Sequence, residues 1–325
     1  MRSYNKFDRQ HAVDTFRDGA PTIDDAPTSE LEANLRRSGI SEINLGMSPT
    51  GFQELSDQYA VCIEQHRRWL NFTAGNFDAD DVPEDGHVRK NKESNAAKMQ
   101  TKDPKNLFQF NNDVTDWWLD EGRYVSERGP NEFAEFMENG IQMHYDTIAR
   151  ARDLVIAPLA ESYRGMNNLY FKKELGNVTL RVIRYDAYRL YDQDGNLVVE
   201  QGAQVAKPHF DRGGMTMQMY SSAAGFWIQP HPVSGRRKPT DPIIKPEFGL
   251  GKSQVFPGIA HKVIYGSHDP INPLFHGVDR IFDESLTEMP ARTSVIGFID
   301  PTHHDLGITS LDTQPDRVDR ENLNI

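Results

Sequence analysis

Short apolar runs separated by turns fill the second half of the chain, and they constrain its fold more than any other feature. The runs lie at residues 178–186, 215–220, 225–230, 253–258, 261–266, 274–278 and 293–300. Gly, Pro and Asp stand between them, and these residues favour tight turns. Many short strands with such turns are typical of a β-sandwich or barrel and disfavour a parallel α/β sheet. We therefore expect an all-β C-terminal half that begins near residue 169.

The first half of the chain has mainly helical patterns. Residues 29–32 match a capping box, which predicts that a short helix begins there. Apolar residues recur at helical spacing over residues 49–70 and 130–164, so two helices are predicted, with Pro158 kinking the last turns of the second. Residues 79–106 are almost all polar and are predicted to form a loop, a lid or a disordered insert.

The two halves are not separated by a linker-like stretch, because the second predicted helix leads directly into the first predicted strand. We therefore expect one integrated domain of the α+β class. Its parts are a helical N-terminal region (residues 1–168) that includes the polar insert, a β core (169–301) and a polar tail (302–325).

The composition narrows the possible partners and metal ligands. The chain of 325 residues has a net charge of −12, and like-charge repulsion disfavours nucleic acids and anionic membranes as partners. No stretch approaches the roughly 20 apolar residues that cross a bilayer, and we expect no secretory signal. Cys62 is the only cysteine, so a reducing cytoplasm is the expected location and a Cys-rich zinc site is excluded. A bound metal would need His, Asp or Glu ligands.

The segment "KPHFDRGGMTMQMY" places His209 two residues before Asp211, next to a run that is predicted to be a buried strand. Side chains at positions i and i+2 of a strand point to the same face, so both groups could reach one ion. Two histidines and one carboxylate leave three coordination positions open, which is the facial triad of non-haem Fe(II) oxygenases. A lone His-x-Asp also arises by chance in a chain with 11 histidines.

A third ligand must come from elsewhere in the chain. We prefer His276, because it lies on a short strand late in the β half and could pair back toward the strand of His209. The other candidates are His231, His261, His268, His303 and His304. His261 is expected to be a core or cavity residue, His231 to lie in a turn between prolines, and the adjacent His303 and His304 to be solvated or to cap an element.

Arg292 and Ser294 are also two residues apart on a predicted strand. An arginine that faces into a β-cavity is a buried charge unless it meets an anion, and a carboxylate matches its two parallel donors. The alternative is a surface arginine paired with Asp or Glu.

These candidate residues follow one another in a fixed order along the β half. His209 and Asp211 come first, His276 follows, and Arg292 and Ser294 come last. This order resembles that of the isopenicillin-N-synthase-like family of Fe(II)/2-oxoglutarate oxygenases.

Neighbouring segments agree with the same resemblance. "LRVIRYD" is similar to the family strand whose tyrosine contacts the co-substrate, which is Tyr185 here, and "GFWI", "VFPG" and "FIDP" are similar to later strands. The resemblance spans residues 130–301 and implies a distorted double-stranded β-helix (jelly roll) with a helical N-terminal region. Ile183 and Gly277 depart from the family pattern, which has Asn and Arg at these positions.

The resemblance also implies the cofactors and the reaction. Fe(II) would be held by His209, Asp211 and His276. The far carboxylate of the co-substrate 2-oxoglutarate would be bound by Arg292, Ser294 and Tyr185. With O2, the site would hydroxylate, desaturate or cyclise a small molecule, for which an amino acid or a tailored metabolite is the candidate class.

Two alternatives remain open from the sequence. One is an iron oxidase of the same fold that does not use 2-oxoglutarate, since an Arg-x-Ser pair can also hold a substrate carboxylate. The other is a non-catalytic jelly-roll binding protein, which would have no tight Fe(II) site.

Overall fold

The structure is a computed structural model of the whole chain. The residues that it describes are 25–70, 87–89, 105–122, 129–172, 175–197, 204–229, 242–247, 251–266, 268–279, 283 and 285–301. Several expectations lie outside these residues: most of the polar insert, His231, His303, His304 and the tail from residue 302 onward.

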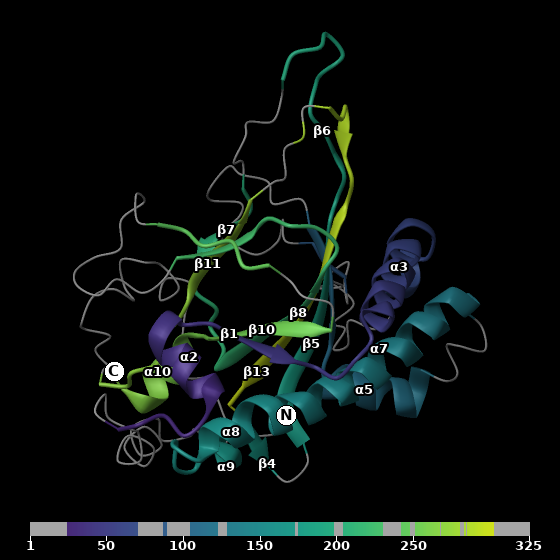
Figure 1. Cartoon of the computed structure of the whole chain (residues 1–325). Helices are drawn as coiled ribbons and strands as arrows, with labels where there is room; N and C mark the ends of the chain where they lie inside the picture. The colour runs from purple at the N-terminus through teal and green to yellow at the C-terminus, as the bar shows by residue number, and fades with distance from the viewer. Residues whose placement is uncertain are drawn as a thin grey trace.

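A large antiparallel sheet is the centre of the fold (Figure 1). Its eight strands follow the order β1-β10-β8-β13-β5-β3-β2, with β4 paired to β5 off this path. The strand bounds in that order are β1 Ser41–Asn44, β10 Lys252–Pro257, β8 Met215–Ser221, β13 Arg292–Asp300, β5 Leu175–Tyr185, β3 Lys105–Phe110, β2 His87–Arg89 and β4 Phe171–Lys172.

A second sheet of three strands faces the large one. Its order is β7-β11-β9, and its strand bounds are β7 Gln204–His209, β11 Phe275–Asp279 and β9 Phe226–Gln229. A two-stranded ribbon of β6 (Tyr188–Arg189) and β12 (Glu288–Met289) extends the long strands β5 and β13 away from the body, as Figure 1 shows.

Helices cover the outer face of the large sheet (Figure 1). Their bounds are α2 Glu30–Ser38, α3 Pro49–Gln65, α4 Arg67–Leu70, α5 Asn112–Trp117, α7 Asn131–Arg150, α8 Ala157–Ala160, α9 Met166–Tyr170 and α10 Ile259–Tyr265. Two π-helical segments, η2 (Trp118–Gly122) and η3 (Ala151–Ile156), continue α5 and α7. Within the part of the chain that the structure describes, no helix has both the length and the apolar composition needed to cross a bilayer.

Side-chain alternation on β5 divides the core into two parts. Val178, Leu180 and Val182 join the large core cluster under the helices. Ile183 and Tyr185 point the other way and pack in a second cluster with side chains of the small sheet. Successive residues of a strand face opposite sides, so the interior of the roll lies between the two sheets.

Most of the predicted elements are present. The helix predicted at residue 29 begins with Ser29 as its N-cap, and its side chain accepts a hydrogen bond from the backbone N–H of Glu32. The π-helical turns of η3 directly precede Pro158, which has no N–H to continue the regular ladder.

The strand predicted at residues 261–266 is wrong, because residues 261–265 belong to α10 and Gly266 is its C-cap. Nearly every side chain of this helix is buried, so it lacks the polar face that would mark a helical period. A short apolar run of this kind is ambiguous between strand and helix. The sequence pattern also did not predict β1 and β3, and β3 begins within the segment that was expected to be a polar insert.

A close approach between α7 and β3 fixes the distance between helix and sheet. A Cβ at Gly140 would lie 2.0 Å from the ring of Phe110, which packs within a cluster of aromatic side chains. Only a glycine lets the helix backbone come this near to the ring.

Gly140→Ala should lower the free energy of unfolding by about 1–2 kcal/mol, because overpacking outweighs the gain in helix propensity. Urea unfolding monitored by circular dichroism measures this change. Asn139→Ala, at an exposed neighbouring position of α7, is the matched control and should change stability little. Equal stability of the Gly140 variant and the parent protein would contradict this packing argument.

Candidate metal centre

The small sheet brings two histidines together. β7 and β11 pair antiparallel, and His276 stands directly opposite His209 in their register. The centroids of the two imidazole rings are 4.6 Å apart. Opposed residues on antiparallel strands have Cβ atoms about 4.5–5.5 Å apart, so the pairing register brings the two imidazoles within reach of one ion.

Asp211 completes the group from a turn. Its Oδ1 lies 3.4 Å from Nε2 of His209 and 3.7 Å from Nε2 of His276. The three candidate ligand atoms all lie within 4.8 Å of one another. The sequence argument placed both His209 and Asp211 on one strand, but β7 ends at His209 and Asp211 lies just beyond it. The turn, and not the alternation of a strand, therefore aims the carboxylate.

Two contacts hold that turn in place. The hydroxyl of Thr216 on β8 donates a hydrogen bond of 2.6 Å to Oδ2 of Asp211. The backbone N–H of Ile259, at the start of α10, donates a hydrogen bond of 2.8 Å to the carbonyl of Asp211. Such outer contacts orient a ligand and leave the other carboxylate oxygen for an ion.

The protonation states suit a metal. Burial lowers the pKa of His276 to about 4, so its imidazole is neutral at pH 7. Its Nδ1 lies 3.1 Å from the carbonyl of Leu274, and donation there leaves the lone pair on Nε2. Burial alone would raise the pKa of Asp211, but the two imidazoles and the Thr216 hydroxyl outweigh burial and lower it. Two imidazoles and one carboxylate fit a six-coordinate Fe(II) with open positions.

One side of the group is open and the other is closed. The His209 side chain is 36% exposed, whereas those of Asp211 and His276 are 10% and 8% exposed. Phe256 and Phe226 pack against the ring of His276, with centroid distances of 4.9 Å and 5.7 Å. A ligand must therefore approach from the side of His209.

Position 277 has no room for a side chain. A Cβ at Gly277 would lie 2.7 Å from the indole ring of Trp227 on the neighbouring strand β9. The indole therefore covers the backbone next to His276.

Arg292 and Ser294 lie on β13 and face the interior of the roll. Arg292 stands opposite Tyr185 in the register, and its guanidinium carbon lies 5.5 Å from the tyrosine ring centroid. The Arg292 Nε donates to the carbonyls of Ala223 and Ala224, both at 3.2 Å. Its Nη1 and the Ser294 Oγ are buried, and neither has a hydrogen-bond partner among the described residues.

Lys105 and Thr216 carry no sequence pattern that marked them as candidates. Lys105 is buried on β3 opposite Tyr185, and its Nζ lies 5.6 Å from the tyrosine ring centroid. It stands at the edge of the polar insert, where no pattern marked a strand. Thr216 could have been noticed, because it interrupts the apolar run "MTMQM" at a position that faces inward.

The rival histidines do not join the group. His261 is fully buried on α10, and its Nε2 lies 2.9 Å from Oδ2 of Asp269. It is a core residue, as expected. His268 is exposed and lies outside the group of candidate ligands.

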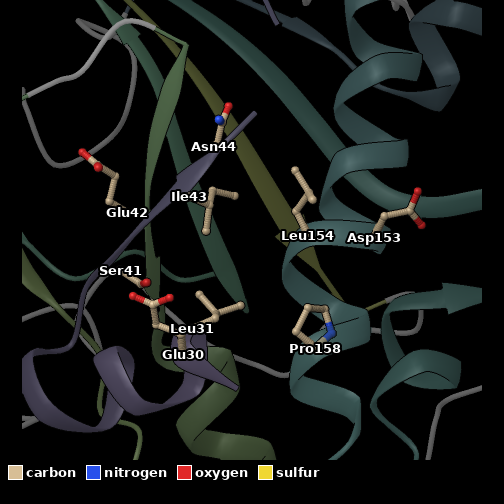
Figure 2. Close-up of a pocket in the computed structure, with 9 residues that line it drawn as sticks. All are labelled: Glu30, Leu31, Ser41, Glu42, Ile43, Asn44, Asp153, Leu154 and Pro158. Carbon is tan, nitrogen blue, oxygen red and sulfur yellow. The ribbon is translucent and has the colours of Figure 1, made fainter. Parts of the chain in front are cut away.

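A separate hollow of about 300 Å³ lies where α2, β1, η3 and α8 meet (Figure 2). None of the candidate metal ligands lines it. Three carboxylates line it: Glu30, Glu42 and Asp153. Glu42 lies 2.5 Å from Nζ of Lys252, and Asp153 lies 2.7 Å from Nε of Arg152, so two of the three acids are held in surface ion pairs.

Comparisons with solved structures agree with this architecture. A full-length Neurospora crassa protein, crystallised in complex with alpha-KG and thymine, aligns with a TM-score of 0.59 at 13% identity, covering 96% of this chain and 88% of that one. A Caulobacter crescentus protein described as 2OG-Fe(II) oxygenase family gives 0.58 at 14% identity, covering 90% and 87%. Arabidopsis thaliana AtDAO1, a dioxygenase for auxin oxidation, gives 0.56 at 14% identity, covering 86% and 91%.

Searches with protein-family models and against curated proteins gave no match. The structural likenesses show that the chain has the fold of the 2OG-Fe(II) oxygenases, a double-stranded β-helix with N-terminal helices. The expected α+β class and the resemblance to the isopenicillin-N-synthase-like fold are thereby confirmed, and the His–Asp–His group is present at its centre.

His276→Ala should abolish stoichiometric Fe(II) binding, because two remaining ligands hold the ion far more weakly than three. Anaerobic titration calorimetry with Fe(II) measures the binding. His66→Ala removes a histidine at the end of α3, outside the group, and should bind like the parent protein. Undiminished binding by the His276 variant would exclude this centre.

Thr216→Val should weaken Fe(II) binding by about tenfold to a hundredfold, because the Asp211 carboxylate loses the donor that orients it. Valine keeps the shape of threonine, so the fold should remain intact by circular dichroism. The same titration decides the outcome, and unchanged affinity would mean that the turn alone orients Asp211.

Proposed function

We propose that this protein is an Fe(II)/2-oxoglutarate-dependent oxygenase that oxidises a C–H bond of a small molecule, with hydroxylation as the basic outcome. One observation carries the proposal. The convergent His209, Asp211 and His276 share the interior of one roll with a buried arginine–serine pair, of which Arg292 Nη1 and Ser294 Oγ lack hydrogen-bond partners among the described residues. A metal site and an anion site inside one roll are what this co-substrate requires.

One set of residues would bind the metal, and a second set would bind the co-substrate. His209, Asp211 and His276 would hold Fe(II), which when bound supplies the activation of O2. The guanidinium of Arg292, the hydroxyl of Ser294 and Tyr185 would bind the far carboxylate of 2-oxoglutarate. Burial lowers the pKa of Arg292, so an anion beside it would be stabilised strongly in this apolar setting.

Lys105 would act with Arg292 on the same carboxylate. Both cations lie over the Tyr185 ring from the two neighbouring strands. Phe226, Phe256 and Ile183 belong with Tyr185 to the apolar cluster between the two sheets and would exclude water around the reacting groups.

Small-molecule substrates are also supported by the solved structures of similar fold, one of which was determined with thymine. The particular substrate of this chain does not follow from that likeness, because substrate contacts vary between proteins of one fold. Desaturation or ring closure of a small molecule would use the same residues.

Arg292→Leu should weaken 2-oxoglutarate binding by about a hundredfold, because a buried carboxylate loses two charge-assisted hydrogen bonds. Fe(II) affinity should stay unchanged, and Arg292→Lys should lie between the two. The measurement is the visible charge-transfer absorption that appears when 2-oxoglutarate is added anaerobically to the Fe(II) protein.

Two outcomes would contradict the proposal. If no charge-transfer band forms while Fe(II) binds, the co-substrate role fails. If O2 is consumed with a substrate but no succinate appears, the protein is an iron oxidase of the same fold that does not consume 2-oxoglutarate. A non-catalytic binding protein would bind no Fe(II) tightly.

A further inference from the structure

The inner face of the large sheet is closed at one end and open at the other. Buried inner-face side chains at the closed end are Lys105, Leu107, Ile183, Tyr185, Arg292 and Ser294. The same strands carry half-exposed inner-face side chains further along, which are Gln109, Arg181, Ile296 and Phe298. The roll is therefore accessible from the end that holds Arg181, and the candidate site of 2-oxoglutarate lies at the other end.

This open end adjoins the metal centre. Phe298 on β13 stands opposite Thr216 on β8, and Thr216 holds the carboxylate of Asp211. The Asp300 carboxyl lies within electrostatic reach of both Asp211 and Arg181. A molecule bound at the open end would thus lie close to the metal centre, on the side of Asp211.

Arg181 is held in one orientation at this end. Its guanidinium carbon lies 4.5 Å from the centroid of the Phe298 ring, so one face of the guanidinium is stacked on the aromatic ring. Its Nη2 donates a hydrogen bond of 2.8 Å to Oε1 of Gln109. A planar fork that is already oriented loses little conformational freedom when it binds a carboxylate.

Two guanidinium groups lie near one carboxyl at this end. The chain carries a net charge of −12, yet Arg181 and the exposed Arg212 both act on Asp300 here. Positively charged side chains at the open end attract an anionic molecule.

We propose that the substrate of this site carries a carboxylate, and that Arg181, oriented by Phe298 and Gln109, binds it at the open end of the roll. Arg181 is a specificity-determining residue, and Arg212 assists at the rim. This inference rests on the proposed function only in calling the bound molecule a substrate. The carboxylate-binding property of the open end can be measured without any turnover.

The test compares small acids with their neutral amides. The probes are phenylacetate, benzoate and hexanoate, each paired with its amide, and the full-length protein is loaded with Zn(II) and saturated with 2-oxoglutarate. Titration calorimetry gives the affinities. At least one acid should bind about tenfold to a hundredfold more tightly than its amide, the range expected for charge-assisted hydrogen bonds.

Variants then assign this preference to one side chain. Arg181→Met should reduce the affinity for the acid to that for the amide and leave 2-oxoglutarate binding unchanged, and Arg181→Lys should retain part of the preference. Arg184→Met is the matched control, because Arg184 lies on the same strand, faces the other way and lies 3.4 Å from Glu64 on α3. It should keep the full preference. Melting temperatures verify that each variant is folded.

Each remaining outcome overturns the inference. If no acid binds better than its amide, the open end does not select carboxylates. If Arg181→Met lowers the melting temperature but keeps the preference, Arg181 serves only to balance Asp300. If the preference is lost in Arg292→Met and kept in Arg181→Met, the acids occupy the buried end.

The two proposals can fail separately. A protein that binds acids through Arg181 and does not bind 2-oxoglutarate would refute the proposed function and keep this inference. A protein that binds 2-oxoglutarate and ignores the charge of the probes would do the reverse.

Discussion

The antiparallel register that sets His276 opposite His209 is the constraint on which the rest of the site depends. Opposed residues on such strands have Cβ atoms about 4.5–5.5 Å apart, so the pairing alone delivers two imidazoles to one place. A slip of one residue would send one ring to the other face of the sheet. Asp211 joins them because the chain leaves β7 after His209 and is held there by Thr216 and by the start of α10.

Alternation of side chains along the strands of the large sheet places apolar core residues on its outer face and candidate ligand-binding residues on its inner face. On β13, Val295 and Ile299 face the helices and contribute to the large core, whereas Arg292 and Ser294 face the interior of the roll. The buried guanidinium is costly to keep without an anion, and this cost is tolerated where an anionic ligand is to be bound. The outer face therefore stabilises the fold, and the inner face is left for ligands.

The sequence predicted secondary structure correctly where the local pattern is compatible with only one type of element. The strands around Tyr185 and Arg292 are short apolar runs with turn residues beside them, and they were predicted close to their actual bounds. The run that became α10 was misread, because a short and almost fully buried segment shows neither a helical nor a strand period. Lys105 escaped notice because β3 is recognisable only through its pairing with β5.

The sequence by itself determined the fold class and most of the residues that could bind a metal or an anion, because residue types and their order along the chain carry that information. Only the tertiary structure decided which histidine joins His209, how Asp211 reaches the same point from a turn, and that Arg181 and Phe298 lie at an open end next to it. Each of these depends on contacts between strands far apart in the chain. Such contacts are set by register and packing between sheets, which no local pattern encodes.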